Sequence, residues 1–267
     1  MAKECFPTLT KTALFALLVT LAGCVTTTDS RFAREADRTK AIENYVQLAT
    51  AYIGQDNIER ARFHVDRALE LDDDNAKALA AQGLVFQAQG ESRLAGESYR
   101  RALSADSSYT RGRVYYGAFL FGQGNFEGAR NEFRRASEDT DYKDRAGIFF
   151  NLGMTEERLG NLSGAENAYR RAVEISRGEP RSLLSLSRVL VEQGEFSSAS
   201  RYYSQLQGLI QRSPRLVHSP ESLYTGIRIA RHFGDRNQES SLALLLRNEY
   251  PESLEHQQYK VLIANDQ

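Results

Sequence analysis

Residues 116–136 read YGAFLFGQGNFEGARNEFRRA, and this stretch contains the features that decide the fold. An apolar helical face runs from Tyr116 to Leu120. Gly124 follows, at a point where glycine can take a positive φ and end the helix at little cost. A second helical stripe then has a small residue, an aromatic residue four positions later and a small residue three positions after that. Its members are Ala129, Phe133 and Ala136. The stretch therefore predicts a helix, a tight turn and a second helix.

The same pattern recurs along the chain with a period of about 34 residues. The stripes of the second helix are Ala61/Val65/Ala68, Ala95/Tyr99/Ala102, Ala129/Phe133/Ala136, Ala165/Tyr169/Ala172 and Ala199/Tyr203/Leu206. A turn glycine stands five residues before most of them, at Gly90, Gly124, Gly160 and Gly194. One such match could arise by chance, but several copies in phase indicate a repeat array.

This spacing resembles the tetratricopeptide repeat, in which helix A, a turn and helix B are followed by a break. We expect an all-α fold, a right-handed superhelical solenoid of stacked repeats. A small residue at position 8 lets helices A and B approach closely, and alanines at positions 20 and 27 fill the crossings. Six repeats are expected within residues 39–253, at 42–75, 76–109, 110–143, 146–179, 180–213 and 220–253.

The two ends of the array are predicted separately. The sixth copy is looser, because Glu239 replaces its first alanine. Residues 254–267 are expected to form a capping helix, since a solenoid needs a closed end. Residues 24–38 are polar and rich in Thr, Asp and Arg, so a short flexible tether is expected there.

An apolar run at 13–21 follows Lys3 and Lys11, which is typical of a secretory signal over residues 1–23. The run is too short to span a bilayer. It ends in Leu21-Ala22-Gly23-Cys24, which resembles the lipoprotein box of bacteria. That resemblance implies cleavage before Cys24 and attachment of lipid, palmitate included, to the new N-terminus. Several acyl chains would anchor the protein stably.

Two further expectations concern this anchor. An aspartate directly after the lipidated cysteine favours retention in the inner membrane in the lipoproteins that this segment resembles. Val25 stands there instead, so the expected location is the periplasmic face of the outer membrane. The alternative is that Cys24 is an ordinary residue behind an ordinary signal peptide.

Composition and motifs argue against several other classes of protein. The chain has 34 basic and 35 acidic residues, and the basic residues form no single block, so no nucleic-acid partner is expected. Cys5 lies in the signal and Cys24 at the lipid site, which leaves no thiol for a disulfide or a metal. The four histidines are scattered, and no phosphate loop or catalytic motif is present. We expect no enzymatic activity, no metal, no cofactor and no small-molecule substrate.

Tetratricopeptide arrays bind partners on a concave face lined by helix A, at positions 2, 5, 9 and 12. In the first four repeats these positions give a groove of apolar residues, Val46, Ile53, Leu84, Val114, Phe121, Phe150 and Met154. In the last two they give Arg181, Arg188, Arg228 and Arg231. The groove is therefore expected to be apolar toward its N-terminal end and basic toward its C-terminal end. An exposed apolar stripe favours a peptide ligand. The alternative is that neighbouring helices partly cover these side chains.

The lipoprotein box, the tether and six repeats together resemble the outer-membrane pilotin lipoproteins of type IV pilus assembly. Tyr116–Gly124 is also similar to the third-repeat helix A of that family, Tyr-Gly-x-Phe-Leu-x-x-Gln-Gly, although Gly122 replaces a cysteine common there. The resemblance implies a protein that binds secretin subunits and promotes their outer-membrane localisation and multimerisation, and so supports twitching motility. The alternative is a periplasmic lipoprotein scaffold for peptidoglycan enzymes or another envelope-assembly machine.

Overall fold

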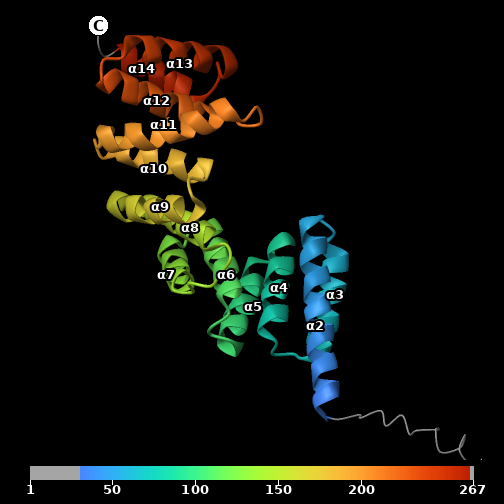
Figure 1. Cartoon of the computed structure of the whole chain (residues 1–267). Coiled ribbons are helices and arrows are strands. Elements are labelled where there is room, and N and C mark those ends of the chain that lie inside the picture. Colours follow the sequence, from blue (N-terminus) through green and yellow to red (C-terminus); the bar gives the residue numbers. More distant parts are fainter. Residues whose placement is uncertain (1–30, 265–267) are drawn as a thin grey trace, which may run out of the picture.

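The computed structural model describes residues 31–264, and its regular secondary structure there is entirely helical. Twelve of the helices form six pairs, which stack in sequence order from α2 at one end to α13 near the other (Figure 1). The pairs are α2 (Arg31–Gly54) with α3 (Ile58–Leu71), α4 (Ala76–Ala88) with α5 (Ser92–Ala105), α6 (Thr110–Gly122) with α7 (Phe126–Ser137), α8 (Arg145–Arg158) with α9 (Leu162–Ser176), α10 (Pro180–Glu192) with α11 (Phe196–Arg212), and α12 (Pro220–His232) with α13 (Arg236–Glu249). The predicted all-α repeat fold is confirmed.

Close approach of the two helices within a repeat depends on the small residue at position 8. A Cβ atom built at Gly83 would lie 2.6 Å from the ring of Tyr99, and one built at Gly153 would lie 2.5 Å from the ring of Tyr169. Both rings are buried. The aromatic side chain of helix B therefore packs directly on the backbone of helix A, as the repeat spacing predicts.

The turns between the paired helices have the predicted left-handed backbone. Gly90, Gly124, Gly160 and Gly194 all have φ between 74° and 80°. The first repeat lacks glycine at this position and places Asp56 there, with φ of 57°. The first repeat thus keeps the left-handed turn although it lacks the glycine that favours this conformation.

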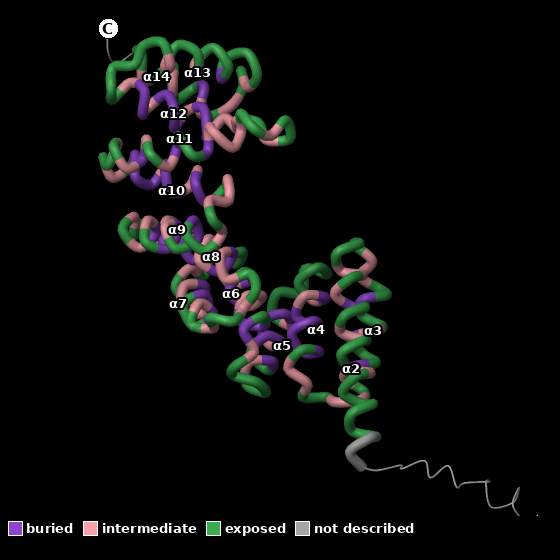
Figure 2. Tube along the Cα trace, in the orientation of Figure 1, coloured by how far each residue is buried: buried purple, intermediate pink, exposed green. Residues whose placement is uncertain are grey.

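The stripe alanines of helix B in the first five repeats are fully buried and carry the core from one repeat to the next. Figure 2 shows the buried residues running through the middle of the stacked pairs, with exposed residues on the outer surfaces. The members of this stripe with no exposed surface are Ala61, Ala68, Ala95, Ala102, Ala129, Ala136, Ala165, Ala172 and Ala199. No separate domain core exists in the part of the chain described, because each pair buries its apolar face against its neighbours.

The N-terminal end of the array agrees only in part with the prediction of a flexible tether over residues 24–38. Helix α2 begins at Arg31, so residues 31–38 are helical and do not belong to a flexible tether. Arg38 Nε donates a hydrogen bond of 2.8 Å to the Leu71 carbonyl at the end of α3, which holds this extra part of α2 against the first repeat. The predicted signal over 1–23 and the lipid site Cys24 lie outside the described residues.

At the other end, α14 (Leu254–Ala264) packs against both α12 and α13. Before the sixth pair, a non-helical segment links α11 to α12, and the Tyr250 hydroxyl donates a 2.7 Å hydrogen bond to the His218 carbonyl within it. Over residues 31–264, no helix is both long and apolar enough to cross a bilayer.

Candidate binding surface on the helix A face

The first helices of the repeats together make up what we call the helix A face. It consists of α2, α4, α6, α8, α10 and α12. Helix α2 contacts α4, α4 contacts α6, and α6 contacts α8. The structure leaves all seven predicted groove residues, Val46, Ile53, Leu84, Val114, Phe121, Phe150 and Met154, partly buried. The seven side chains nevertheless fall into separate environments.

A hollow with a volume of about 700 Å³ lies at the N-terminal part of this face. Val46 contributes to its wall, together with Thr50 on the next turn of α2. The wall further includes Lys77 at the start of α4 and two tyrosines from the breaks between repeats, Tyr109 and Tyr142. A hollow of this size, with apolar and polar groups on its wall, is suited to holding part of a peptide.

A second and much smaller hollow, of about 90 Å³, lies further along the helix A face. Phe121 and Met154 line it, with the buried ring of Phe133 beneath them. Phe121 also meets the ring of Phe126 edge-on, with 5.3 Å between ring centroids. The structure therefore brings two of the predicted groove residues together around a pocket that can accept one apolar side chain.

The remaining predicted residues serve mainly in packing. Ile53 packs on the core around Ala49 and Val65, and Leu84 on the core around Tyr99. Val114 packs beside Phe121 on the third and fourth repeats. Phe150 lies beneath the Arg181 guanidinium, whose central carbon is 4.5 Å from the ring centroid.

The prediction that the C-terminal end of the groove is basic is wrong. Each of its four arginines is paired with a carboxylate of the same face or a neighbouring turn. The pairs are Arg181–Glu179 at 3.2 Å, Arg188–Glu157 at 2.6 Å, Arg231–Glu239 at 2.8 Å, and Arg228–Glu192. The helix positions of the arginines predict that they lie on this face. Their carboxylate partners, however, come from other helices or other turns. These cations are therefore neutralised within the fold.

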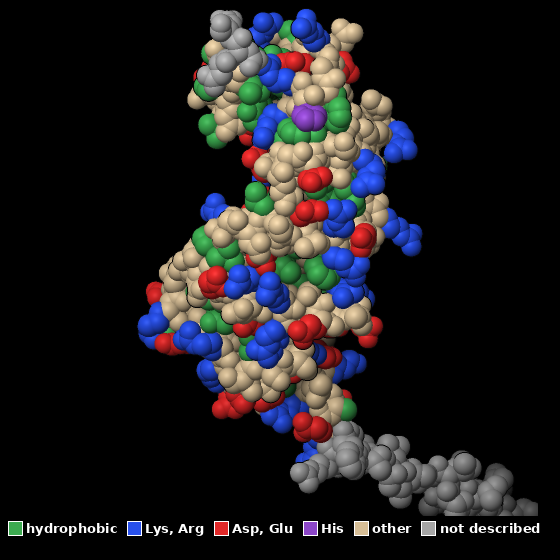
Figure 3. Space-filling model, turned by 90° about the vertical axis from the view of Figure 1, so that its left-hand side faces the viewer, with side chains coloured by type: hydrophobic (Ala, Val, Ile, Leu, Met, Phe, Trp, Pro, Cys, Tyr) green, Lys and Arg blue, Asp and Glu red, His purple; other side chains and the backbone are tan. Residues whose placement is uncertain are grey.

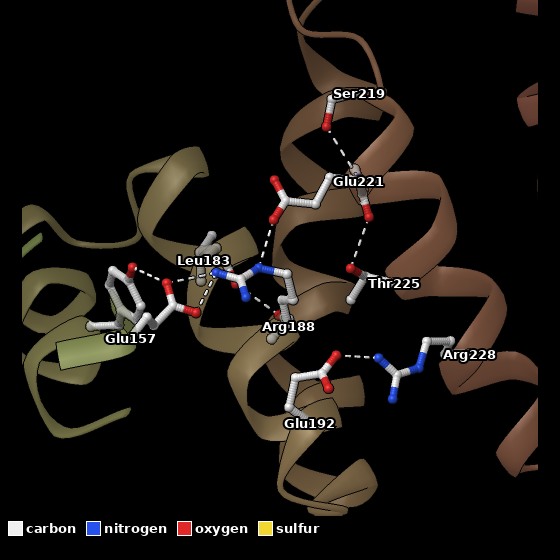
Figure 4. A network of polar contacts seen from close by, with 11 residues as sticks. Glu157, Leu183, Arg188, Glu192, Ser219, Glu221, Thr225 and Arg228 are labelled. Carbon is white, nitrogen blue, oxygen red and sulfur yellow. Dashed lines mark hydrogen bonds and ion pairs between the residues drawn. The ribbon is translucent and has the colours of Figure 1, made fainter. Parts of the chain in front are cut away.

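Arg188 is the centre of a network that crosses three repeats (Figure 4). Its guanidinium contacts Glu157 of α8 at 2.6 Å and Glu221 of α12 at 2.6 Å. The buried Tyr169 hydroxyl donates a 2.6 Å hydrogen bond to Glu157. Burial first, and the Glu157 carboxylate second, raise the pKa of Tyr169 well above its usual value. The network joins helices and offers no free charge to a ligand.

The sequence interpretation missed several residues of the larger hollow. Glu43, Lys77 and Arg111 stand at position 2 of the first three repeats, and Lys77 Nζ bonds Glu43 Oε1 at 2.7 Å. Position 2 belongs to the expected groove, but these three residues are charged and so are not part of its predicted apolar stripe. Tyr109 and Tyr142 come from the breaks between repeats, outside helix A. Burial, followed by the neighbouring Tyr115, raises the pKa of Tyr109 to about 12.

Charge on the outer surface is mixed. In the view of Figure 3, acidic and basic side chains alternate over the face, with apolar side chains between them. This distribution matches the nearly balanced composition of 34 basic and 35 acidic residues. It offers no extended basic surface on this side of the molecule, so binding here would depend on local groups.

Comparison with known proteins agrees with the geometry. A family profile described as Tetratricopeptide repeat matches residues 46–110 and 120–180. The fold and its helix A face thus define a tetratricopeptide-repeat protein. Type IV pilus assembly protein PilF of Pseudomonas aeruginosa is 34% identical over 249 residues, which cover 92% of this chain and 96% of that protein. The chain belongs to the tetratricopeptide-repeat family that includes PilF.

Solved structures show the same relationship. That of Pseudomonas aeruginosa PilF superposes with a TM-score of 0.75 at 33% identity, and covers 84% of this chain and 99% of the PilF chain. PilW, a widely conserved type IV pilus biogenesis factor, matches with a TM-score of 0.66 at 24% identity, over 82% of this chain and 97% of its own. The PilW match shows the shared fold. The predicted resemblance to the pilus-assembly family is confirmed.

Proposed function

We propose that this protein is an outer-membrane lipoprotein that binds secretin subunits and promotes their localisation and multimerisation for type IV pilus assembly. The observation that carries this proposal is the identity of 34% with PilF over nearly the whole of both chains. PilF is named for type IV pilus assembly. The helix A face supplies the physical means, since its hollow of about 700 Å³ has a wall suited to a peptide segment.

The mechanism proposed is tethering. Lipid on Cys24 would hold the array at the membrane, and two or more acyl chains anchor a protein stably. A secretin subunit bound to the helix A face would then be kept close to the membrane in which it assembles. Such confinement raises its effective concentration and favours formation of the multimer. No covalent step is involved.

The gene should be deleted in its host and the outer-membrane fractions examined for detergent-resistant secretin multimer on a denaturing gel. Loss of the multimer, with secretin monomer still present, would support the proposal. Complementation with Cys24→Ala should restore neither outer-membrane fractionation of this protein nor the multimer. An unchanged multimer in the deletion strain would instead favour the periplasmic scaffold for peptidoglycan enzymes or another envelope-assembly machine.

The helix A face can be tested in the same strain with Phe121→Asp. A charge in this apolar pocket should weaken secretin binding about tenfold or more, because a carboxylate is costly to bury against an apolar side chain of the partner. Phe63→Asp is the matched control, since Phe63 is an exposed aromatic residue of α3 outside the helix A face. Both variants should keep wild-type helicity by circular dichroism. Equal binding by the two variants would place the contact elsewhere.

A further inference from the structure

A second surface lies at the end of the array opposite to α2, on α13 and α14 (Figure 1). A hollow of about 520 Å³ opens between these two helices. Ala243, Leu244 and Arg247 line it from α13, and Tyr259, Lys260 and Ile263 line it from α14. The spacing of the three residues is the same on both helices, so each presents one helical stripe to the hollow. Two facing stripes form a groove that fits a third helix.

The stacking order of the repeats shows which neighbour α14 lacks. Helix α14 contacts α12 and α13 in the way that α12 contacts α10 and α11. It therefore occupies the place of helix A in a seventh repeat. Helix α12 is paired with its own helix B, which is α13. Among the described residues, α14 has no such partner, because the helices end at Ala264.

Exposure at equivalent positions shows that the described residues leave part of α14 uncovered. Ile227 of α12 is 0% exposed, whereas Val261, at the equivalent position 34 residues later, is 61% exposed. Ile229 is 4% exposed and its equivalent, Ile263, is 38% exposed. The same kind of side chain at the same repeat position is thus buried in α12 and accessible in α14. Of the two α14 residues, Ile263 lines the hollow and Val261 does not. Accessible apolar surface of this kind marks a docking site when it forms a contiguous groove.

The charges of the groove indicate the chemistry of its occupant. Arg247 and Lys260 both line the hollow, and no acidic residue lines it. Neither makes an ion pair with any carboxylate of residues 31–264, in contrast to the four paired arginines of the helix A face. Burying these cations against another helix requires a partner of opposite charge.

We propose that the α13–α14 groove binds an amphipathic helix of another protein, with an apolar stripe flanked by acidic residues. A second copy of this chain fits less well, since every described helix is already packed within the array. This site is separate from the helix A face and does not depend on the secretin proposal. Helix-in-groove binding of this type uses anchors at i, i+3, i+4 and i+7.

A synthetic helix B provides a defined probe. The peptide has the sequence of residues 162–176, which contains the repeat stripe Ala165/Tyr169/Ala172, with Arg170→Glu and Arg171→Glu to make it acidic. The peptide with the native arginines is its charge control. Fluorescence anisotropy would measure the binding of each labelled peptide to the purified chain. We expect saturable binding of the acidic peptide, and at least about tenfold weaker binding of the native-sequence peptide.

Neighbouring residues of α13 provide matched protein variants. Leu244 and Leu245 are 48% and 43% exposed, but only Leu244 lines the groove. Leu244→Asp should weaken binding of the acidic peptide about tenfold or more, and Leu245→Asp should leave it unchanged. Lys260→Glu should remove the preference for the acidic peptide. Circular dichroism should show that all three variants are folded.

Three results would overturn the proposal. The first is the absence of saturable binding by the acidic peptide. The second is an equal effect of Leu244→Asp and Leu245→Asp, which would show that the groove is not the contact. The third is a dimer in analytical ultracentrifugation that Leu244→Asp dissociates and Leu245→Asp does not, which would assign the groove to a second copy of the chain.

Discussion

The Arg188 guanidinium lies 2.6 Å from Oε1 of Glu157, and this contact joins helix A of the fifth repeat to helix A of the fourth. Glu221 of the sixth repeat contacts the same guanidinium at 2.6 Å. Arg188, which its helix position predicts to line a ligand groove, thus connects three repeats. In a solenoid, where each repeat contacts only its neighbours, such a connection couples the stability of adjacent repeats.

Glu157→Gln should therefore destabilise the C-terminal repeats. The loss should be about 1–3 kcal/mol, because Arg188 and the Tyr169 hydroxyl both lose a charged partner within a largely buried site. Urea denaturation followed by circular dichroism would measure it. Glu174→Gln is the control, since the Glu174–Arg171 pair is exposed and such pairs contribute about 1 kcal/mol or less. Equal losses in the two variants would contradict a special role for the Arg188 network.

Gly153→Ala should destabilise the fold by about 1–3 kcal/mol. The added Cβ would lie 2.5 Å from the buried ring of Tyr169, so helices α8 and α9 would have to separate. Gly122→Ala is the matched control, because a Cβ at that helical position meets no atom within 4 Å. It should be neutral, or stabilising by about 0.4–1 kcal/mol. Thermal denaturation would compare the two, and similar melting temperatures would argue against the close helix approach.

Asp56→Gly should stabilise the first repeat. Asp56 has φ of 57°, a conformation that costs energy for a residue with a Cβ, and glycine fills this turn position in the other repeats. The gain should be about 0.5–1 kcal/mol. Gln55→Gly is the control, because Gln55 does not have a positive φ, and the change there should be neutral or destabilising. Hydrogen exchange of the α2 and α3 amides would report the effect in this repeat. Faster exchange in Asp56→Gly than in the wild type would be the opposite result.

Stability should fall as the pH drops below about 6.5, partly through His218. Burial lowers the pKa of His218 below its usual 6.5, so the folded state holds this proton less well than the unfolded state. Between the two pKa values the unfolded chain binds more protons, and stability therefore decreases as the pH falls. His218→Gln should flatten the dependence of the free energy of unfolding on pH between 5 and 7. His232→Gln, a change on α12, is the control that should retain it.

The repeat register was predictable because each of its signals is local. Gly90, Gly124, Gly160 and Gly194 mark the turns, and the alanine stripes mark the crossings between helices. Both are set by backbone conformation and by the space between packed helices, and both recur at a fixed spacing along the chain. The tether predicted from the polar composition of residues 31–38 was wrong. That segment is helical, and Arg38 reaches the carbonyl of Leu71, which is 33 residues away in the sequence.

The predicted groove residues differ in their surroundings, and their binding of a partner stays a prediction. Phe121 and Met154 come together because both stand at position 9 or 12 of neighbouring helices A, whose packing is regular. Tyr109 and Tyr142 were missed because they belong to the breaks between repeats and reach the hollow only in the folded array. Val46 lines that hollow beside them, whereas Ile53 and Leu84 are used mainly in packing.

The sequence by itself determined the repeat fold, the positions of the turns and the membership of the PilF family, because these depend on residue spacing along the chain. The tertiary structure decided the charge of the helix A face and the open groove at α13–α14. Ion pairs such as Arg188–Glu157 and the exposure of Ile263 depend on side chains from separate repeats. Spacing within one repeat carries no information about those partners, since only stacking brings them into contact.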